Sequence, residues 1–329
     1  MSLHVLLLHL PRDESAAVEL TARLDPSVHL SLGPELPEPP DYEVLVTGRP
    51  ERAQIEASPH LRALIVPWAG IPDTTRQLMR DYPDIEVHNL HHNALPVAEH
   101  ALALLLAAAK FIVPMDRALR KHDWRPRYEA NPSVLLEGRT ALILGYGAIG
   151  QKLAKLCQGL GMEVLGIRQH APPGGDVQPD GVRLFAVEAL HRLLPKTEAV
   201  LVCLPHTSQT TGLVGARELA LLPPQAILVN VGRGPVVDEQ ALYEALGAGR
   251  LYAAGLDVWY QYPETEAARA DTPPASYPFH ELPNVVMSPH RAGGSTETDR
   301  LRMIRLAALL NAAACGEAMP NRVDLDAGY

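Results

Sequence analysis

The stretch ALILGYGAIG, residues 141–150, decides the fold prediction, because an apolar run there leads directly into three closely spaced glycines. The apolar run predicts a buried strand, and residues 148–160 have the spacing of a helix. Between a strand and a helix, such glycines allow a tight turn, a close backbone approach to a pyrophosphate and close helix–strand packing. The helix N-terminus adds free N–H groups and partial positive charge. The stretch therefore predicts a dinucleotide-binding loop, with a purely structural glycine turn as the alternative.

The residue after the next predicted strand, 163–167, bears on which dinucleotide is bound. An acidic residue at this point would accept hydrogen bonds from the adenosine ribose, but the chain has Arg168. A guanidinium has donors only, so it cannot take that role. It can pair with a 2′-phosphate and stack on adenine. Arg168 therefore favours NADP over NAD; an Arg that only stacks on the adenine of NAD is the alternative.

Strand-like and helix-like segments alternate over most of the chain, which predicts the α/β class with a doubly wound parallel sheet of the Rossmann type. A long helix over 97–124 should kink or restart at Pro114. A further helix is predicted at 238–248, and a final one begins near Ser295 with Glu297 in its first turn. The predicted strands are 3–9, 43–47, 62–66, 85–89, 140–144, 163–167, 199–203, 226–230, 252–256 and 284–287.

Composition excludes several classes of protein. The 329 residues suffice for about two domains, and the net charge of −9 without a basic run argues against nucleic-acid or anionic-membrane partners. Three widely spaced cysteines predict neither a disulfide framework nor a zinc ribbon. The N-terminus lacks an export signal and the longest apolar stretch is short for a bilayer, so we expect a cytoplasmic protein. The histidines between residues 88 and 100 fit no common zinc spacing, so no metal is predicted.

Three polar residues follow consecutive predicted strands. Arg233 lies in NVGRG, Asp257 in LDVW and His290 in SPHRAGG. Carboxyl ends of parallel strands share one edge of the sheet, where ligands bind. An arginine there can clamp a carboxylate, and a histidine can pass the proton that accompanies hydride transfer. Asp257 either contacts the cofactor or caps a turn.

These motifs together resemble those of the D-isomer-specific 2-hydroxyacid dehydrogenase family, in particular glyoxylate/hydroxypyruvate reductases. The resemblance runs through residues 66–70, 97–107, 145–150, 202–207, 230–234, 255–259 and 288–294. It implies an NAD(P)-binding Rossmann domain at 98–293, inserted into a flavodoxin-like substrate-binding domain. That second domain would comprise 1–97 and a C-terminal helix in 294–329. The resemblance also implies a homodimer.

The resemblance assigns roles to individual residues. Arg233 would bind the substrate carboxylate together with the backbone around Ala69 and Gly70, and His290 would be the acid/base. Trp68 and Asn93 are further candidates for the substrate pocket. Cofactor contacts are expected from Gly145, Tyr146, Gly147, Ala148, Ile149, Gly150, Arg168, Cys203, Leu204, Pro205, Thr210, Val231, Gly232, Arg233, Asp257, His290, Ala292 and Gly293.

The chain departs from the family pattern at one catalytic position. Most members have a glutamate five residues beyond the DV aspartate, where it bonds the catalytic histidine, but this chain has Tyr262. A carboxylate would raise the pKa of the imidazole and a neutral phenol does not, so we expect His290 to titrate lower than in relatives with the glutamate. Tyr262 would orient the ring instead. The alternative is a loop shift that lets Glu264 reach His290.

The sequence thus predicts an NADP-preferring reductase that converts small 2-oxo acids of the glyoxylate or hydroxypyruvate type to D-2-hydroxy acids; NAD is the other possible cofactor. Two alternatives remain. One is a catalytically weak NAD(P)-sensing protein on the same scaffold, which the missing glutamate would suit. The other is a formate-dehydrogenase-like enzyme, for which the DVW strand end and Asn93 are the only support.

Overall fold

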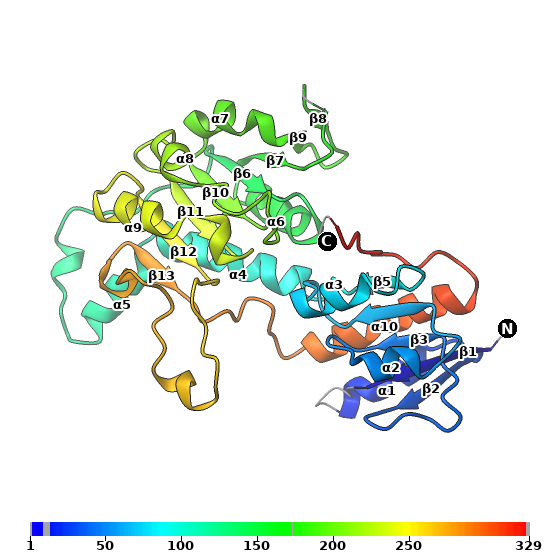
Figure 1. The fold of residues 1–329 in the computed structure, drawn as a ribbon. Helices are drawn as coiled ribbons and strands as arrows, with labels where there is room; N and C mark the ends of the chain where they lie inside the picture. Colours follow the sequence, from blue (N-terminus) through cyan, green and yellow to red (C-terminus); the bar gives the residue numbers. More distant parts are fainter. Residues whose placement is uncertain (1, 9–13, 173, 327–329) are drawn as a thin grey trace. The chain divides into compact units, whose positions relative to one another are not determined.

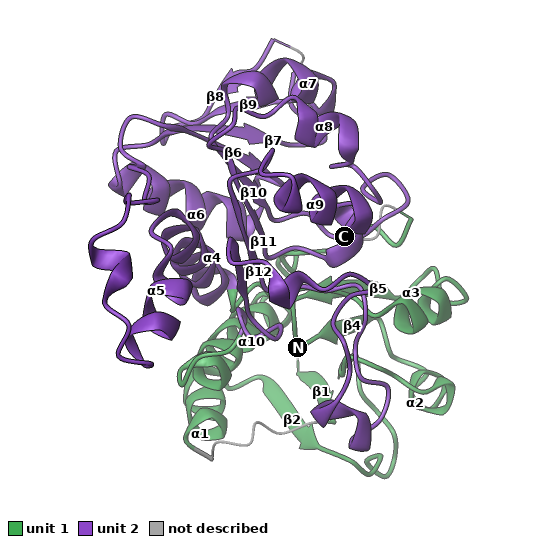
Figure 2. Ribbon diagram, turned by 90° about the vertical axis from the view of Figure 1, so that its left-hand side faces the viewer, with its two compact units in different colours: residues 1–93, 294–329 green, residues 94–293 purple. Residues whose placement is uncertain are grey.

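The computed structural model describes residues 2–8, 14–172 and 174–326. The chain divides into two compact units (Figure 2). Unit 1 comprises residues 1–93 and 294–329, and unit 2 comprises residues 94–293. The chain therefore leaves unit 1 after β5 and returns to it before its last helix, with all of unit 2 inserted between.

Unit 1 is built on a five-stranded parallel sheet with the order β2-β1-β3-β4-β5 (Figure 1). This order is the flavodoxin-like one, as predicted. The strand β2 was not among the predicted strands; it lies at the edge of the sheet and is only partly buried, so its sequence lacks a continuous apolar run. The elements are β1 (Leu3–Leu7), α1 (Glu14–Arg23), β2 (Val28–Leu32), β3 (Val44–Val46), α2 (Arg52–Glu56), β4 (Ala63–Val66), α3 (Asp73–Met79), β5 (Glu86–Asn89) and α10 (Thr298–Ala314).

Both faces of this sheet are covered, which explains why β3 and β4 are apolar throughout. On one face, residues such as Val44 and Ile65 pack with α1 and α10. On the other face, residues such as Leu45 and Leu64 pack with Ile55 of α2 and with α3. The first predicted strand ends at Leu7, and residue 9 lies outside the described residues, as do 327–329.

Unit 2 contains an eight-stranded sheet with the order β13-β12-β11-β10-β6-β7-β9-β8, parallel except for β8. The order reverses between β6 and β10, so the sheet is doubly wound, as predicted. The short β8 and β9 were not predicted. The elements are α4 (Ala94–Ala109), α5 (Ile112–Leu119), β6 (Thr140–Leu144), α6 (Ala148–Gly159), β7 (Glu163–Ile167), β8 (Asp176–Val177), β9 (Arg183–Phe185), α7 (Leu190–Leu193), β10 (Ala199–Val202), α8 (Ala216–Ala220), β11 (Ile227–Asn230), α9 (Glu239–Gly247), β12 (Ala253–Leu256) and β13 (Val285–Met287), with short 3-10 turns between some of them.

The sheet of unit 2 separates two cores. The helices α4 and α6 pack on one face with residues such as Ala141 and Val229, and α7, α8 and α9 pack on the other. The strands are parallel and in register, so Leu144, Val202 and Asn230 lie level with one another. The loops that follow them therefore emerge at one carboxyl edge.

Two predicted helices differ in their bounds. The long helix begins at Ala94 and breaks at Phe111, which has φ +51°, before α5 restarts with Pro114 in its first turn. No single helix in the described ranges is long and apolar enough to cross a bilayer, although the bent pair α4 and α5 passes that test by length and composition. The last helix begins at Thr298, later than predicted, because the backbone N–H of Ser295 bonds the Thr298 hydroxyl at 2.7 Å in a turn before it.

Candidate active site

The glycine loop, residues 145–150, connects β6 to α6, and its glycines differ in their surroundings. Gly145 has φ +98°, and a side chain there would meet the backbone of Cys203 at 3.1 Å. A Cβ at Gly150 would lie 2.4 Å from the carbonyl oxygen of Gly145, so this glycine permits the close packing of helix and loop. A Cβ at Gly147 would meet nothing within 4 Å. The open space over Gly147, at the N-terminus of the twelve-residue α6, fits a diphosphate group.

The side chain of Tyr146 points into the core. It is 3% exposed, and its hydroxyl donates to the Asp180 carboxylate at 2.5 Å. Burial and this carboxylate raise the pKa of the phenol far above its usual range. The side chain therefore lies in the protein interior. Only the backbone of Tyr146 remains for the predicted cofactor contact.

Arg168 follows β7 and is exposed. Its backbone N–H donates to the carbonyl oxygen of Phe185 at 3.0 Å. This bond fixes the backbone from which the side chain extends. No hydrogen bond or ion pair holds its guanidinium among the residues that the structure describes, so the group is available to an anionic ligand. The neighbouring Gln169 amide donates to the side-chain oxygen of Gln209 at 3.3 Å, and this contact links the loops that follow β7 and β10.

The loop after β10 carries four of the predicted cofactor residues. The Thr210 hydroxyl donates to the carbonyl oxygen of Pro205 at 2.7 Å and accepts from the backbone N–H of Thr207 at 2.8 Å. Burial raises the pKa of the Cys203 thiol to about 12, so this cysteine behaves as a small apolar residue. The backbone of Leu204 lies against Gly232, where a Cβ would be 2.4 Å from its carbonyl oxygen.

Arg233 lies in a turn that Asn230 holds. The Asn230 amide donates to the carbonyl oxygen of Arg233 and accepts from the backbone N–H of Gly232, each at 3.0 Å. Gly234 allows a close approach to Trp259, since a Cβ there would be 2.3 Å from the carbonyl oxygen of that residue. The Arg233 side chain is exposed, and its guanidinium donates to the carbonyl oxygen of Gly232 at 2.7 Å. Asn230 was not predicted; its position at the end of a strand, two residues before Gly232, was the available signal.

His290 lies in a second turn, which we call the His290 turn (residues 288–292). Its φ of +56° is unusual for a residue with a side chain. Asp257, 1% exposed, accepts from the backbone N–H of Arg291 at 2.9 Å and of Ala292 at 3.0 Å. It thus takes the structural role that the sequence left open, while its predicted cofactor contact stays a prediction. Val231 and Ala292 are buried beside the two turns, and Gly293 ends unit 2.

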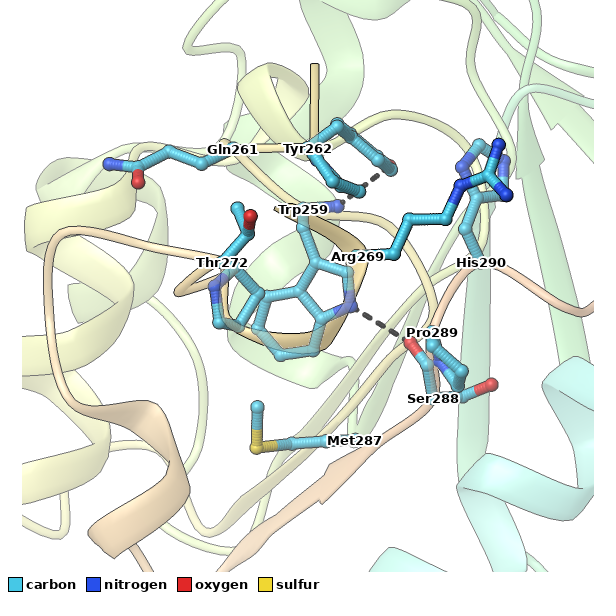
Figure 3. A pocket seen from close by; sticks show the side chains of 11 residues that line it. Trp259, Gln261, Tyr262, Arg269, Thr272, Met287, Ser288, Pro289 and His290 are labelled. Carbon is cyan, nitrogen blue, oxygen red and sulfur yellow. Dashed lines mark hydrogen bonds between the residues drawn. The ribbon is translucent and has the colours of Figure 1, made fainter. Parts of the chain in front are cut away.

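Tyr262 lies beside His290, with ring centroids 5.5 Å apart and planes tilted by 55° (Figure 3). Its hydroxyl accepts from the backbone N–H of Trp259 at 3.1 Å. Desolvation lowers the pKa of His290, and the positive charge of Arg233 lowers it further. The comparison with relatives that carry the glutamate stays a prediction. No hydrogen bond or ion pair joins Glu264 to His290 in the described part of the chain, so the alternative of a shifted loop gains no support.

A cavity of about 640 Å³ opens next to His290. Figure 3 shows its lining, in which Tyr262 and Arg269 come from the connection between β12 and β13 and His290 follows β13. The walls are mostly apolar, from Trp259, Met287 and three prolines. The cavity therefore offers apolar surface next to the side chains of His290 and Arg269.

The predicted substrate residues of unit 1 follow β4 and β5. The Asn89 amide donates to the carbonyl oxygen of Ala69 at 2.7 Å, which ties the 68–70 loop to the end of β5. Trp68 covers Gly48 so closely that a Cβ there would lie within 1.9 Å of the indole. Gly70 is partly exposed. The side-chain oxygen of Asn93 is buried and has no hydrogen-bond partner among the described residues.

The histidines between residues 88 and 100 have separate environments. The His88 ring lies 3.0 Å from the carbonyl oxygen of Pro320, and burial lowers the pKa of His92 to about 4. His100 belongs to unit 2 and bonds Ser288. Within the described ranges, no three His, Cys, Asp or Glu side chains are placed to hold a metal ion.

Comparison with known families identifies the chain. The family described as "D-isomer specific 2-hydroxyacid dehydrogenase, NAD binding domain" matches residues 102–292, more than half of the chain. The chain therefore belongs to the D-isomer specific 2-hydroxyacid dehydrogenase family, as the motifs predicted. The matched region lies wholly within unit 2 and contains the glycine loop and both turns.

Individual relatives carry more specific names. The chain is 34% identical over 236 residues to D-3-phosphoglycerate dehydrogenase of Mycobacterium leprae, which covers 72% of this chain and 42% of the relative. It is 38% identical over 236 residues to glyoxylate reductase of Korarchaeum cryptofilum, covering 69% and 65%. The chain thus spans about half the length of the curated D-3-phosphoglycerate dehydrogenases that it matches.

Solved structures show the same two-unit fold. A D-isomer specific 2-hydroxyacid dehydrogenase from Xanthobacter autotrophicus, in complex with NADPH and MES, superposes with a TM-score of 0.79 at 27% identity over all of both chains. An NADPH-dependent glyoxylate/hydroxypyruvate reductase from Sinorhizobium meliloti reaches 0.76 at 20% identity, also over all of both chains. At that identity the second match supports the fold alone.

Proposed function

We propose that the protein is an NADP-preferring oxidoreductase that reduces small 2-oxo acids to D-2-hydroxy acids. The observation that carries the proposal is the pairing of Arg233 and His290 in turns at one sheet edge, beside the glycine loop. A cation and an imidazole in one site suit a substrate in which a carboxylate adjoins a carbonyl. The family membership and the glyoxylate reductase among the relatives support the same reaction.

In this proposal Arg233 clamps the substrate carboxylate. The further contact that the resemblance implies, from the backbone N–H groups around Ala69 and Gly70, stays a prediction. His290, as the imidazolium, donates a proton to the carbonyl oxygen. A reduced nicotinamide supplies the hydride when bound. Unit 2 would thus serve as the NAD(P)-binding domain and unit 1 as the substrate-binding domain.

The preference for NADP rests on Arg168. Its exposed guanidinium follows β7, where a 2′-phosphate would find a bidentate cationic partner. The relative from Xanthobacter autotrophicus, in complex with NADPH, supports this choice of cofactor. Glyoxylate and hydroxypyruvate are the proposed substrates. A homodimer in the cytoplasm stays a prediction from the resemblance.

A turnover assay tests the proposal. The purified protein is mixed with NADPH or NADH and a panel of 2-oxo acids, and with formate and NADP or NAD, while the absorbance of the reduced nicotinamide is followed. We expect oxidation of NADPH with glyoxylate or hydroxypyruvate, and a D product on chiral chromatography. Tight binding of NADPH without turnover on any acid would overturn the proposal in favour of a sensor, and turnover of formate would favour the formate-dehydrogenase alternative.

A further inference from the structure

Three polar side chains from distant parts of unit 2 meet at the His290 turn, to which Ser288 itself belongs. Asp257 follows β12, Ser288 follows β13, and His100 lies on α4. The Ser288 hydroxyl donates to the Asp257 carboxylate at 2.6 Å, and the Nε2 atom of His100 lies 3.0 Å from the same hydroxyl and 3.4 Å from the carboxylate. The sequence separation between His100 and Ser288 is 188 residues, so only the folded chain brings them together.

The proton positions in this cluster follow from its donors and acceptors. The carboxylate of Asp257 can only accept, so the hydroxyl hydrogen of Ser288 points to it. The remaining capacity of that hydroxyl is to accept, which requires a hydrogen on the Nε2 atom of His100. The chain of bonds therefore runs from His100 through Ser288 to Asp257, and Asp257 in turn holds the backbone N–H groups of Arg291 and Ala292.

Every polar group of Ser288 takes part in a hydrogen bond. Its backbone N–H donates to the carbonyl oxygen of Leu256 at 2.8 Å, and its own carbonyl oxygen accepts from the indole of Trp259 at 2.8 Å. Figure 3 shows this second bond between two of the residues that line the cavity next to His290. Together with the bonds to Asp257, these contacts bracket His290, since they hold the residues on both sides of it.

The imidazole of His290 makes no hydrogen bond to any residue that the structure describes. Its backbone is in the left-handed region, which costs free energy unless the surroundings hold it. The direction of the ring therefore depends on the turn.

We infer that His100 is a positioning residue for His290, which acts through Ser288 and Asp257 to hold the His290 turn in its reactive geometry. The expected fall in kcat rests on the proposed function. The expected change in the geometry of the His290 turn does not. Small displacements of a reacting group cost large factors in rate, so loss of this support lowers kcat rather than substrate binding. His100 itself touches neither substrate nor cofactor in this account.

The kinetic experiment compares His100→Ala with His100→Gln in the full-length enzyme. The glutamine amide keeps a donor at a similar reach, whereas alanine removes it. We expect kcat for reduction of the 2-oxo acid to fall about ten- to a hundredfold in His100→Ala, with KM changed less than threefold, and to recover largely in His100→Gln. Ser288→Ala should match His100→Ala and abolish the rescue by glutamine. The exposed His280→Ala is the control.

A second readout does not depend on activity. In cofactor-free protein labelled with ¹⁵N-histidine, the signal of His290 is assigned by its loss in His290→Gln and titrated by NMR. We expect His100→Ala and Ser288→Ala to move its chemical shifts and titration midpoint, and His100→Gln to leave them near those of the wild type. An unchanged His290 signal in both His100→Ala and Ser288→Ala would overturn the inference.

The two readouts separate the inference from the proposed function. If the wild-type protein reduces no 2-oxo acid, the proposed function fails and the NMR comparison alone decides on the positioning role. If His100→Ala does not fold, as judged by its thermal melting curve, Ser288→Ala and its double variant with His100→Gln decide instead. Equal losses of kcat in His100→Gln and His100→Ala, together with a changed fold in both variants, would show a merely structural role. That outcome would contradict the inference.

Discussion

The glycine loop and the His290 turn lie at the carboxyl edge of the same sheet, but different interactions hold them. The glycine loop is shaped by its own residues: Gly145 takes a positive φ, and Gly150 makes room for the carbonyl oxygen of Gly145. The His290 turn is shaped from outside, by Asp257 31 residues before Ser288 and by His100 188 residues before it. The glycine loop is thus held by local interactions, and the His290 turn is held by tertiary interactions.

The difference corresponds to what each region does in the proposed reaction. A diphosphate needs backbone N–H groups and open space, and glycines provide both without outside help. A proton donor needs a fixed side chain, and an imidazole in a strained backbone conformation needs support from packed neighbours. The turn that contains Arg233 is intermediate, because Asn230, which holds it by two hydrogen bonds, is only three residues away.

The largest effect on kcat/KM is expected at His290, the proposed proton donor in the turn that distant residues hold. Substitution of His290 by Gln keeps the size of the side chain but removes the acid. General acid catalysis contributes about 10²- to 10⁴-fold, so kcat/KM for the 2-oxo acid should fall by that factor. Steady-state kinetics measures it, with NADPH binding by fluorescence as the control. A loss of less than tenfold would mean that another group donates the proton.

A matched pair of glycine variants tests the local character of the glycine loop. In Gly150→Ala the new methyl meets a backbone oxygen at 2.4 Å, so the free energy of unfolding should fall by about 2 kcal/mol. In Gly147→Ala the methyl enters open space, so unfolding should change by no more than about 0.5 kcal/mol.

The same pair should separate stability from binding. Because the methyl of Gly147→Ala occupies the space proposed for the diphosphate, its affinity for NADPH should drop about tenfold or more while the fold is retained. Urea denaturation and fluorescence titration measure the two quantities. Equal NADPH affinity in Gly147→Ala and wild type would place the diphosphate elsewhere.

The next effect concerns the choice of cofactor. Arg168→Gln removes a charge-assisted hydrogen bond to the proposed 2′-phosphate, which is about 2 kcal/mol or roughly thirtyfold in kcat/KM for NADPH. The value for NADH should change little, since it has no such phosphate. The exposed Arg217→Gln on α8 is a matched charge control. A parallel loss for both cofactors in Arg168→Gln would show stacking on adenine instead.

The smallest effect is a shift in pH dependence. Reduction requires the imidazolium of His290, so activity declines as the pH rises through its pKa, and a lowered pKa makes that decline begin earlier. Tyr262→Glu places a carboxylate beside the ring and raises its pKa, so the alkaline limb of kcat/KM should move up by about one pH unit. Tyr262→Phe, which adds no charge, should leave the limb nearly in place. An unmoved limb in Tyr262→Glu would contradict this account.

Much of the fold could be predicted because it depends on local pattern. The strands over 140–144 and 163–167 were predicted at their observed bounds, since continuous apolar runs mark buried parallel strands. The strands β2, β8 and β9 were missed because they are short or lie toward the edges of the sheets, where burial does not demand an apolar run.

The site was predictable only in part. The residue types at the strand ends revealed Arg233 and His290, but nothing in the sequence showed that Asp257 bonds the backbone of the His290 turn or that Trp259 and Ser288 are joined. The sequence also did not show how the Tyr262 ring lies against His290. Its distance and tilt depend on how the loop over residues 260–283 packs.

The sequence by itself determined the α/β class with its doubly wound sheet, the glycine loop and the chemical character of the residues at the sheet edge. These features follow from hydrophobic spacing and from the backbone freedom of glycine, which act over a few residues. Only the tertiary structure decided which groups support His290. Hydrogen bonds between α4, β12 and β13 form because packing brings distant segments to within about 3 Å, and no local pattern encodes that approach.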